Sequence, residues 1–361
     1  MAIIIGNTTV NTSIAGSNVT VNVPQGYAEY NATRNSIMPT LRLDFVNSNV
    51  LDPRITFTRA SSATYFNSAG ALTTAANNIP RFDYNPSTLV CNGLLIEQSS
   101  VNILLNSATL STQSVTTTAT TYTLSFYGTG TVTLSGTYAG SLVGSGAFPT
   151  RSRLSFTATA GTLTLTVTGN VSYAQLEALS FPTSYIATTG ASATRSADVA
   201  SIPLGTLFNS NAFTVYTENI MANITPVEYP RILVIDNGSS VVNGIQILTT
   251  PTSNPPVRLY GVIGSTGGFP GSGNSVLLYT AGAITKGALS VSSSSAYIAW
   301  NGATPVANNT AFGTYTPSSF TTLWISAPVA ETGGSTYCGW ARRIILWTQA
   351  LSNNELISLT S

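Results

Sequence analysis

The segment TYTLSFYGTGTVTLSGTYAG, residues 121–140, alternates large apolar residues with small polar ones. The same alternation returns in GTLTLTVTG, residues 161–169. Apolar side chains at every second position lie on one face of a β-strand, and the glycine-containing turns end each run. These repeats predict short antiparallel strands with one buried face, the arrangement of a β-sandwich.

The C-terminal part of the chain contains eight further apolar runs at regular spacing, beginning with residues 213–218 and 231–235. This spacing predicts a second sandwich. One helix is expected, at residues 352–359, where Ser352 and Glu355 have the spacing of a capping box. We therefore expect an all-β chain with two antiparallel β-sandwiches of the jelly-roll or lectin type in tandem.

Four regions are expected along the chain. Residues 1–40 contain too few large apolar residues for a core of their own, so we expect an extended docking arm, with a frayed terminus as the alternative. Residues 41–107 are rich in turn signals and predict a loop-rich module. A carbohydrate-binding-like sandwich is expected at residues 108–201 and a concanavalin-A-like or laminin-G-like sandwich at residues 202–361.

Charge and composition exclude several classes of function. The chain has 361 residues, 13 Lys and Arg, 12 Asp and Glu, no histidine and a formal net charge of +1. A nearly neutral surface disfavours binding to nucleic acid or to anionic lipid, and no apolar run is long enough for a leader or a membrane span. The two cysteines, Cys91 and Cys338, are far apart and are expected to be buried free thiols.

No motif for nucleotide, nucleophile or metal chemistry is found. Without histidine, Ser-His-Asp, Cys-His and His-ligated metal sites are excluded, and the acidic residues are mostly solitary. We therefore predict that the chain is not an enzyme and holds neither a cofactor nor a metal ion. A polysaccharide depolymerase with two carboxylates paired across strands is the alternative.

Eight of the charged residues lie in the region 41–107. They are Arg42, Asp44, Asp52, Arg54, Arg59, Arg81, Asp83 and Glu97. Interspersed opposite signs in a charge-poor chain predict internal ion pairs that fix loops, rather than a catalytic carboxylate.

Aromatic residues of the C-terminal region are the candidates for glycan binding. Phe269 lies in a glycine-rich stretch, and Trp340 stands at the start of a predicted strand, with Tyr260 and Tyr279 in the same region. A flat ring packs on the C–H face of a sugar while neighbouring polar groups bind its hydroxyls. Simple packing of these rings within loops and core is the alternative.

Several stretches resemble proteins of tailed-bacteriophage virions. The first set is LDF (43–45), LDPRITFTRAS (51–61), PRFDYNP (80–86), GLLIE (93–97) and Asn102. A second set is QLE (175–177), TSYI (183–186) and TRSAD (194–198). The ending RIILW (343–347) with ALSNNEL (350–356) looks like the last strand and helix of a laminin-G or concanavalin-A-like lectin sandwich.

This resemblance implies a structural protein on the surface of a phage particle, made in the cytoplasm of a bacterial host. The expected role is a tail-fibre or spike adhesin for a host surface glycan, and a capsid decoration or head-fibre protein is the alternative. The resemblance also implies a homotrimer that contacts other virion proteins through the N-terminal arm. It supplies no catalytic residue.

Overall fold

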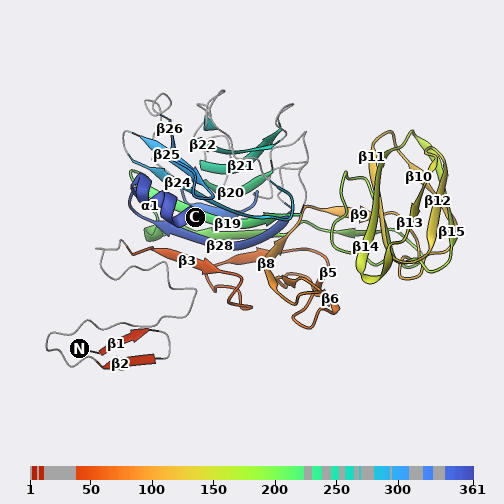
Figure 1. The fold of residues 1–361 in the computed structure, drawn as a ribbon, viewed down its shortest axis with the longest axis horizontal. Coiled ribbons are helices and arrows are strands. Elements are labelled where there is room, and N and C mark those ends of the chain that lie inside the picture. The colour runs from red at the N-terminus through yellow and green to blue at the C-terminus, as the bar shows by residue number, and fades with distance from the viewer. Residues whose placement is uncertain are drawn as a thin grey trace. The chain divides into compact units, whose positions relative to one another are not determined.

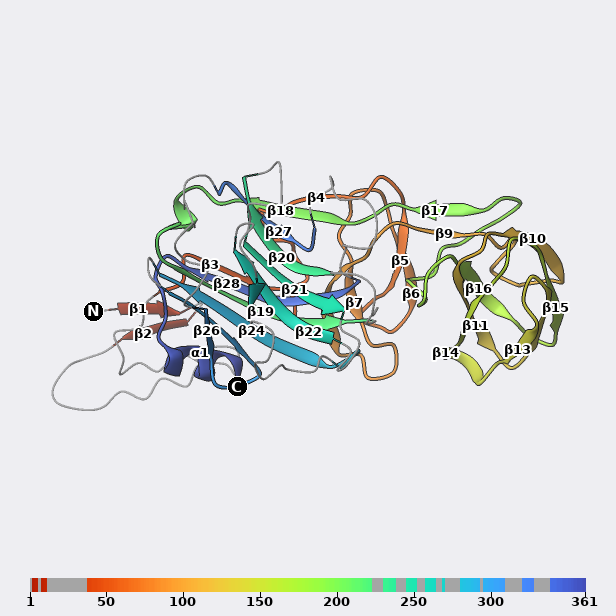
Figure 2. The same cartoon turned by 90° about the horizontal axis from the view of Figure 1, so that it is seen from above.

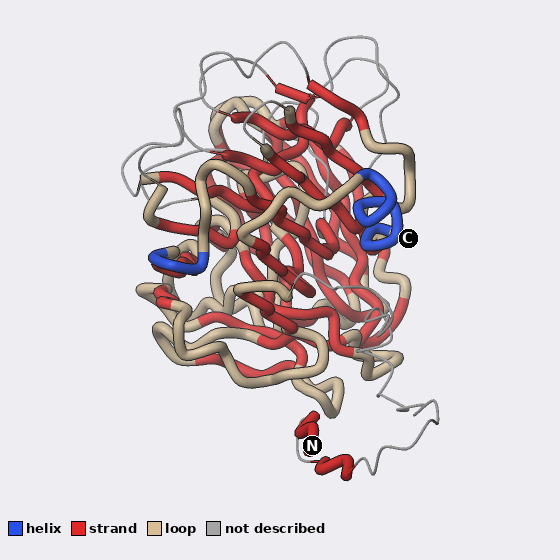
Figure 3. The backbone as a smooth tube through the Cα atoms, turned by 90° about the vertical axis from the view of Figure 1, so that its left-hand side faces the viewer, coloured by secondary structure: helices blue, strands red, loops and turns tan. Residues whose placement is uncertain are grey.

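The computed structural model describes residues 2–5, 8–11, 38–222, 230–237, 245–251, 257–263, 268–269, 280–292, 295–308, 320–327 and 338–361. It divides into two units, Met1–Ile37 and Met38–Ser361. In the first unit, β1 (Ala2–Ile5) pairs with β2 (Thr8–Asn11). The described part of the second unit is nearly all antiparallel β-structure, which confirms the predicted fold class (Figure 3).

The larger sandwich of the second unit consists of two facing sheets (Figure 1). One sheet contains, in spatial order, β23 (Gly268–Phe269), β22 (Val257–Ile263), β21 (Ile245–Pro251), β20 (Arg231–Asp236), β27 (Thr322–Ile325), β18 (Val199–Pro203) and β4 (Thr56–Thr58). The other contains β26 (Val306–Asn308), β25 (Ala296–Trp300), β24 (Ile284–Val291), β19 (Phe213–Met221), β28 (Gly339–Trp347), β8 (Cys91–Ile96) and β7 (Phe82–Tyr84), with β3 (Leu41–Asp44) also paired to β28. Apolar residues of both sheets form one buried core.

The two sheets are built from distant parts of the chain. Strands β3, β4, β7 and β8 come from residues 41–107. Strands β3 and β8 pair with β28 of the C-terminal region, β4 pairs with β18, and β7 joins the same sheet as β28 through β8. The sequence assigns these two regions to separate domains, whereas the strands share sheets and a core. Local alternation does not reveal this, because it shows which face of a strand is buried but not which strand lies beside it.

The smaller sandwich is contiguous in sequence. Its four-stranded sheet contains β10 (Gln113–Thr117), β15 (Gly161–Thr168), β12 (Thr131–Gly136) and β13 (Gly140–Val143). Its three-stranded sheet contains β14 (Gly146–Thr157), β11 (Thr121–Gly128) and β16 (Ser172–Glu177). The predicted alternation is present, since Tyr122, Leu124 and Phe126 are buried in the core between these sheets.

This smaller sandwich is an insertion into the larger one. The chain leaves the larger sandwich after β8 and re-enters it at β18. Between these points, β9 (Ser100–Asn102) pairs with β17 (Ala193–Arg195), and Figure 2 shows the two strands side by side. The pair forms a two-stranded stem at the base of the insertion.

Few other elements are present among the described residues. Hairpin β5 (Ala63–Phe66) and β6 (Leu72–Ala75) belongs to the region 41–107, and η1 (Gly205–Leu207) is a single 3-10 turn. The helix α1 (Asn353–Thr360) lies against β24 and β25 and begins with the predicted Ser352–Glu355 capping box. None of the described helices has the length and apolarity that a membrane crossing requires.

Candidate functional site

Three charged residues of the region 41–107, Arg59, Arg81 and Glu97, belong to a buried network at the base of the insertion. Asp198, just before β18, accepts hydrogen bonds from Arg59 at 3.0 Å and from Arg81 at 2.5 Å. The same carboxylate accepts the backbone N–H of Glu97 at 2.9 Å, and the Asp198 N–H donates to the Glu97 carbonyl. Asp198 thus joins the two points at which the chain leaves and re-enters the larger sandwich.

The network also fixes the smaller sandwich. The Glu97 carboxylate forms an ion pair with Arg81 at 2.8 Å and accepts hydrogen bonds from the N–H and hydroxyl of Ser184. Burial by itself would raise the pKa of Glu97, but Arg195, Arg81 and the Ser184 hydrogen bonds lower it to about 2. Since these side chains are buried, the network confirms the prediction of internal ion pairs and offers no carboxylate to a substrate.

One buried carboxylate lacks a cationic partner in this network. Asp83 of β7 accepts hydrogen bonds from the Phe66 N–H at 2.7 Å and from the Trp340 indole N–H at 2.8 Å. Burial raises the pKa of Asp83 to about 6, even though these hydrogen bonds favour the charged form. The residue therefore ties the β5–β6 hairpin to β28 and changes its charge in the mildly acidic range.

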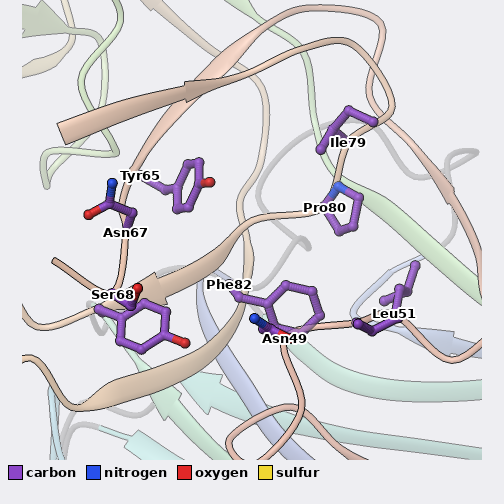
Figure 4. Close-up of a pocket in the computed structure, with 10 residues that line it drawn as sticks. Asn49, Leu51, Tyr65, Asn67, Ser68, Ile79, Pro80 and Phe82 are labelled. Atoms are coloured by element: carbon purple, nitrogen blue, oxygen red, sulfur yellow. The ribbon is translucent and has the colours of Figure 1, made fainter. Parts of the chain in front are cut away.

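A pocket of about 440 Å³ lies within the region 41–107 (Figure 4). Three segments line it: the loop after β3, the β5–β6 hairpin, and the segment that leads into β7. The lining residues are Asn49, Val50, Leu51, Tyr65, Asn67, Ser68, Ile79, Pro80, Phe82 and Tyr84. Three of them are aromatic, and none carries a charge.

Local sequence rules explain how the pocket wall forms. Phe82 and Tyr84 are two residues apart in β7, so their side chains lie on the same face of the strand. The Asn67 side chain accepts the N–H groups of Ala69 and Ala71, which shapes the turn between β5 and β6. Gly70 closes that turn with φ +73°, a conformation that favours glycine.

The polar groups of the pocket suit a neutral ligand. Among the described residues, the Asn49 amide and the hydroxyls of Tyr65 and Ser68 form no hydrogen bond with one another or with other groups. Burial, together with Cys91 and Tyr65 nearby, raises the pKa of the Tyr84 phenol, so this group stays protonated. The pocket therefore combines flat apolar rings with uncharged hydrogen-bonding groups.

The residues that the sequence nominates for glycan binding lie elsewhere. Trp340 is in β28, between β19 and β8, and its half-buried indole donates to Asp83. Phe269 in β23 and Tyr260 in β22 lie on adjacent strands of the opposite sheet, and their side chains are outside the described atoms. Tyr279 lies outside the described residues. The structure thus places Trp340 in a different sheet from Phe269 and Tyr260.

The pocket residues were not singled out by the sequence. Tyr65, Phe82 and Tyr84 are spread over two elements, and the aromatic pair of β7 looks like an ordinary strand pattern. The available signal is the alternation Phe82-Asp83-Tyr84 shortly after Pro80, which places two rings on one face beside a turn. Only the pairing of β7 with β8 and the position of the β5–β6 hairpin bring the rings together.

Comparison with solved structures finds similarities of low identity and low TM-score. Domain 4 of a GH43 extracellular arabinanase from Geobacillus stearothermophilus, in complex with arabinotriose, is 15% identical over 46% of this chain and 73% of its own, with a TM-score of 0.35. A heptameric SAP-like pentraxin from Limulus polyphemus is 13% identical over 42% of this chain and 70% of its own, with a TM-score of 0.33. Trypanosoma rangeli sialidase in complex with sialic acid is 12% identical over 45% of this chain and 26% of its own, with a TM-score of 0.35.

No family model and no curated protein matches the chain. The structural similarities are weak, but they include glycoside hydrolases and sialidases, which contradicts the prediction that the chain is not an enzyme. The prediction relied on the absence of histidine and of nucleophile motifs. Glycoside hydrolysis needs neither, because it proceeds through carboxylates or, in sialidases, a tyrosine nucleophile.

Proposed function

We propose that this chain is a surface protein of a tailed-bacteriophage particle and binds a neutral host glycan in the pocket formed by Tyr65, Phe82 and Tyr84. The observation that carries the glycan part is the pocket itself, which has aromatic walls, no charged lining residue and unpaired neutral polar groups. A sugar presents apolar C–H faces and hydroxyls, and these match aromatic rings and neutral hydrogen-bonding groups.

The phage part of the proposal is supported by the arrangement of the stretches that resemble virion proteins. The first set includes Arg59, Arg81 and Glu97, and the second includes Ser184 and Asp198. All five side chains meet in the same buried network. Two sequence patterns that are far apart therefore belong to one structural unit, the base from which the smaller sandwich projects.

In this proposal the N-terminal arm, residues 1–40, attaches the protein to the particle, and three copies associate. Several weak glycan sites on one particle then act together, because binding at one site raises the effective concentration at the next. Light scattering should give a mass of three chains. Immunogold labelling of particles should place the protein on the tail, whereas labelling spread over the head would favour the capsid decoration role.

The glycan site is tested with the full chain on an array of immobilised neutral oligosaccharides. We expect binding to at least one glycan, and a loss of tenfold or more in Tyr65→Ala, because the ring supplies both an apolar face and a hydroxyl. Tyr297→Ala is the matched control, since Tyr297 in β25 is also half-buried and is remote from the pocket lining.

Two results would overturn the pocket assignment. One is an array on which the wild-type chain binds no neutral glycan. The other is a Tyr65→Ala variant that binds with wild-type affinity. Release of reducing ends during the incubation would instead show hydrolysis, and it is measured in the same samples.

A further inference from the structure

A row of five aromatic rings crosses one end of the three-stranded sheet of the smaller sandwich. Consecutive centroids are separated by 5.4 Å for Phe66 and Phe148, 5.3 Å for Phe148 and Tyr127, 6.2 Å for Tyr127 and Tyr173, and 5.3 Å for Tyr173 and Tyr185. Phe148, Tyr127 and Tyr173 belong to β14, β11 and β16, which are neighbours in that sheet. The row therefore runs across the strands, on the face opposite the core.

Two rings of this row are exposed to solvent. Phe148 has 37% and Tyr173 has 36% of its surface accessible, with the buried Tyr127 between them. By contrast, Tyr185 at one end is held by a 2.7 Å hydrogen bond between its hydroxyl and Ser107. The exposed rings of Phe148 and Tyr173 are thus flanked by the buried rings of Tyr127 and Tyr185.

The backbone at Tyr173 adopts a strained conformation. Its φ is +49°, in the left-handed region that non-glycine residues rarely occupy. A tyrosine at such a position costs stability relative to glycine, and strain of this kind is concentrated at functional sites. Among the described residues its hydroxyl has no hydrogen-bond partner, so it is available to a ligand.

The charged side chain next to the row, that of Arg151, already donates hydrogen bonds within the protein. Arg151 lies 5.9 Å from the Tyr127 ring centre, but its guanidinium donates to the Thr183 carbonyl at 2.6 Å and to the Ser125 hydroxyl at 2.8 Å. Its Nε–H is buried without a partner. The row consequently suits an uncharged ligand with apolar faces and hydroxyls more than an anionic one.

We propose that this aromatic row is a second carbohydrate-binding surface, which takes an extended neutral oligosaccharide rather than a single sugar. The inference rests on the proposed function, because it assigns to the row the same class of ligand as the pocket. The two sites share strand β5: Tyr65 lines the pocket, while the next residue, Phe66, begins the row. Adjacent residues of a strand point to opposite faces, so β5 separates the two sites.

The experiment uses the full chain and the neutral glycan that binds best on the array, prepared as a size series from the monosaccharide to the hexasaccharide. Calorimetric titration should show affinity that rises with chain length in the wild-type protein. Phe148→Leu keeps the apolar volume and removes the ring, and Tyr173→Gly removes the ring and relieves the strain. Each variant should lose most of the rise with length, while affinity for the shortest sugars stays unchanged.

The control for the backbone change is Asn106→Gly. Asn106 is an exposed residue with φ +50°, so this variant places a glycine at another left-handed position without loss of a ring. We expect both glycine variants to unfold at the same temperature as the wild type or higher, and only Tyr173→Gly to lose the length dependence. A Tyr173→Gly variant that unfolds at a lower temperature and binds normally would show that the ring serves packing alone.

The two proposals fail in different ways. If Tyr65→Ala abolishes binding of every length and the row variants bind as the wild type does, the row is not a site and the pocket stands. If the row variants lose binding and Tyr65→Ala does not, the pocket assignment fails and the row stands. If the wild-type chain binds no member of the array, both are overturned.

Discussion

The two sandwiches of this chain are assembled from the sequence in different ways. The strands of the smaller one lie within a contiguous segment, residues 113–177, and pack around an apolar core. The larger one combines strands from both sides of that insertion, and the base where these parts meet holds buried arginines and carboxylates. The contrast indicates that local alternation is enough to specify a contiguous sandwich, whereas distant segments need directional polar contacts to fix their partners.

The four tryptophans make this contrast measurable. Trp300, Trp324, Trp340 and Trp347 lie in β25, β27 and β28 of the larger sandwich. Tryptophan fluorescence therefore reports on the larger sandwich alone, while far-UV circular dichroism reports on both.

The largest effect is expected from Asp198→Asn. The substitution removes the carboxylate that pairs with the buried Arg59 and leaves Arg81 with Glu97 alone. Removing one partner of a buried ion pair typically costs about 3–5 kcal/mol. Urea unfolding followed by tryptophan fluorescence should show a loss in this range, and a loss below about 1 kcal/mol would mean that the network does not hold the two parts together.

A core substitution in the smaller sandwich should give the opposite pattern. Leu165 is fully buried in that core, and Leu→Ala at such a site costs about 2–5 kcal/mol. In Leu165→Ala, the circular dichroism transition should begin at lower urea concentration while the fluorescence transition stays in place. Coincident shifts of both signals would show that the two sandwiches unfold as one unit.

The pH dependence of stability sharpens the comparison at the base of the insertion. Burial raises the pKa of Asp83 to about 6, so Asp83 binds a proton more tightly in the folded protein than in the unfolded chain. The contribution of Asp83 to stability therefore decreases as the pH rises from about 4 to above 6. The pKa of Glu97 is lowered to about 2, so its contribution is present above about pH 4.5 and is lost as the pH falls toward 2.

Together these shifts place the maximum of stability at about pH 4. We expect the wild-type chain to be more stable at pH 5 than at pH 7.5 by about 1 kcal/mol, measured by urea unfolding in matched buffers. Asp83→Asn should remove this difference, because the amide does not titrate. A variant that keeps the wild-type slope between pH 5 and 7.5 would assign the dependence to another group.

The smallest effect is expected at the surface of the same region. Arg54 pairs with Asp52 at 2.7 Å, but the Arg54 side chain is 41% exposed. Exposed pairs contribute about 0–1 kcal/mol, so Arg54→Met should change the free energy of unfolding by less than about 1 kcal/mol. Arg59→Met, five residues further on, serves as the buried counterpart and should cost several times more, since Asp198 then loses a partner. Equal losses in the two variants would contradict the division into buried network and surface pair.

Several features followed from particular residues without knowledge of the tertiary structure. The alternation of Tyr122, Leu124 and Phe126 gave both the strand and its buried face, and Ser352 with Glu355 marked the start of the last helix. The interspersed charges of the region 41–107 correctly indicated internal ion pairs. These inferences depend on neighbours within a few residues, where backbone geometry dictates which side chains share a face.

Only the tertiary structure decided which distant segments meet. The partner of Arg59 is Asp198, at a sequence separation of 139, and no local pattern relates the two residues. The pocket has the same origin, because Tyr65 and Phe82 become neighbours only in the tertiary structure, where β5 lies against β7. The physical reason is that periodicity records whether a side chain is buried, whereas the identity of its partner depends on strand order and register across the whole sheet.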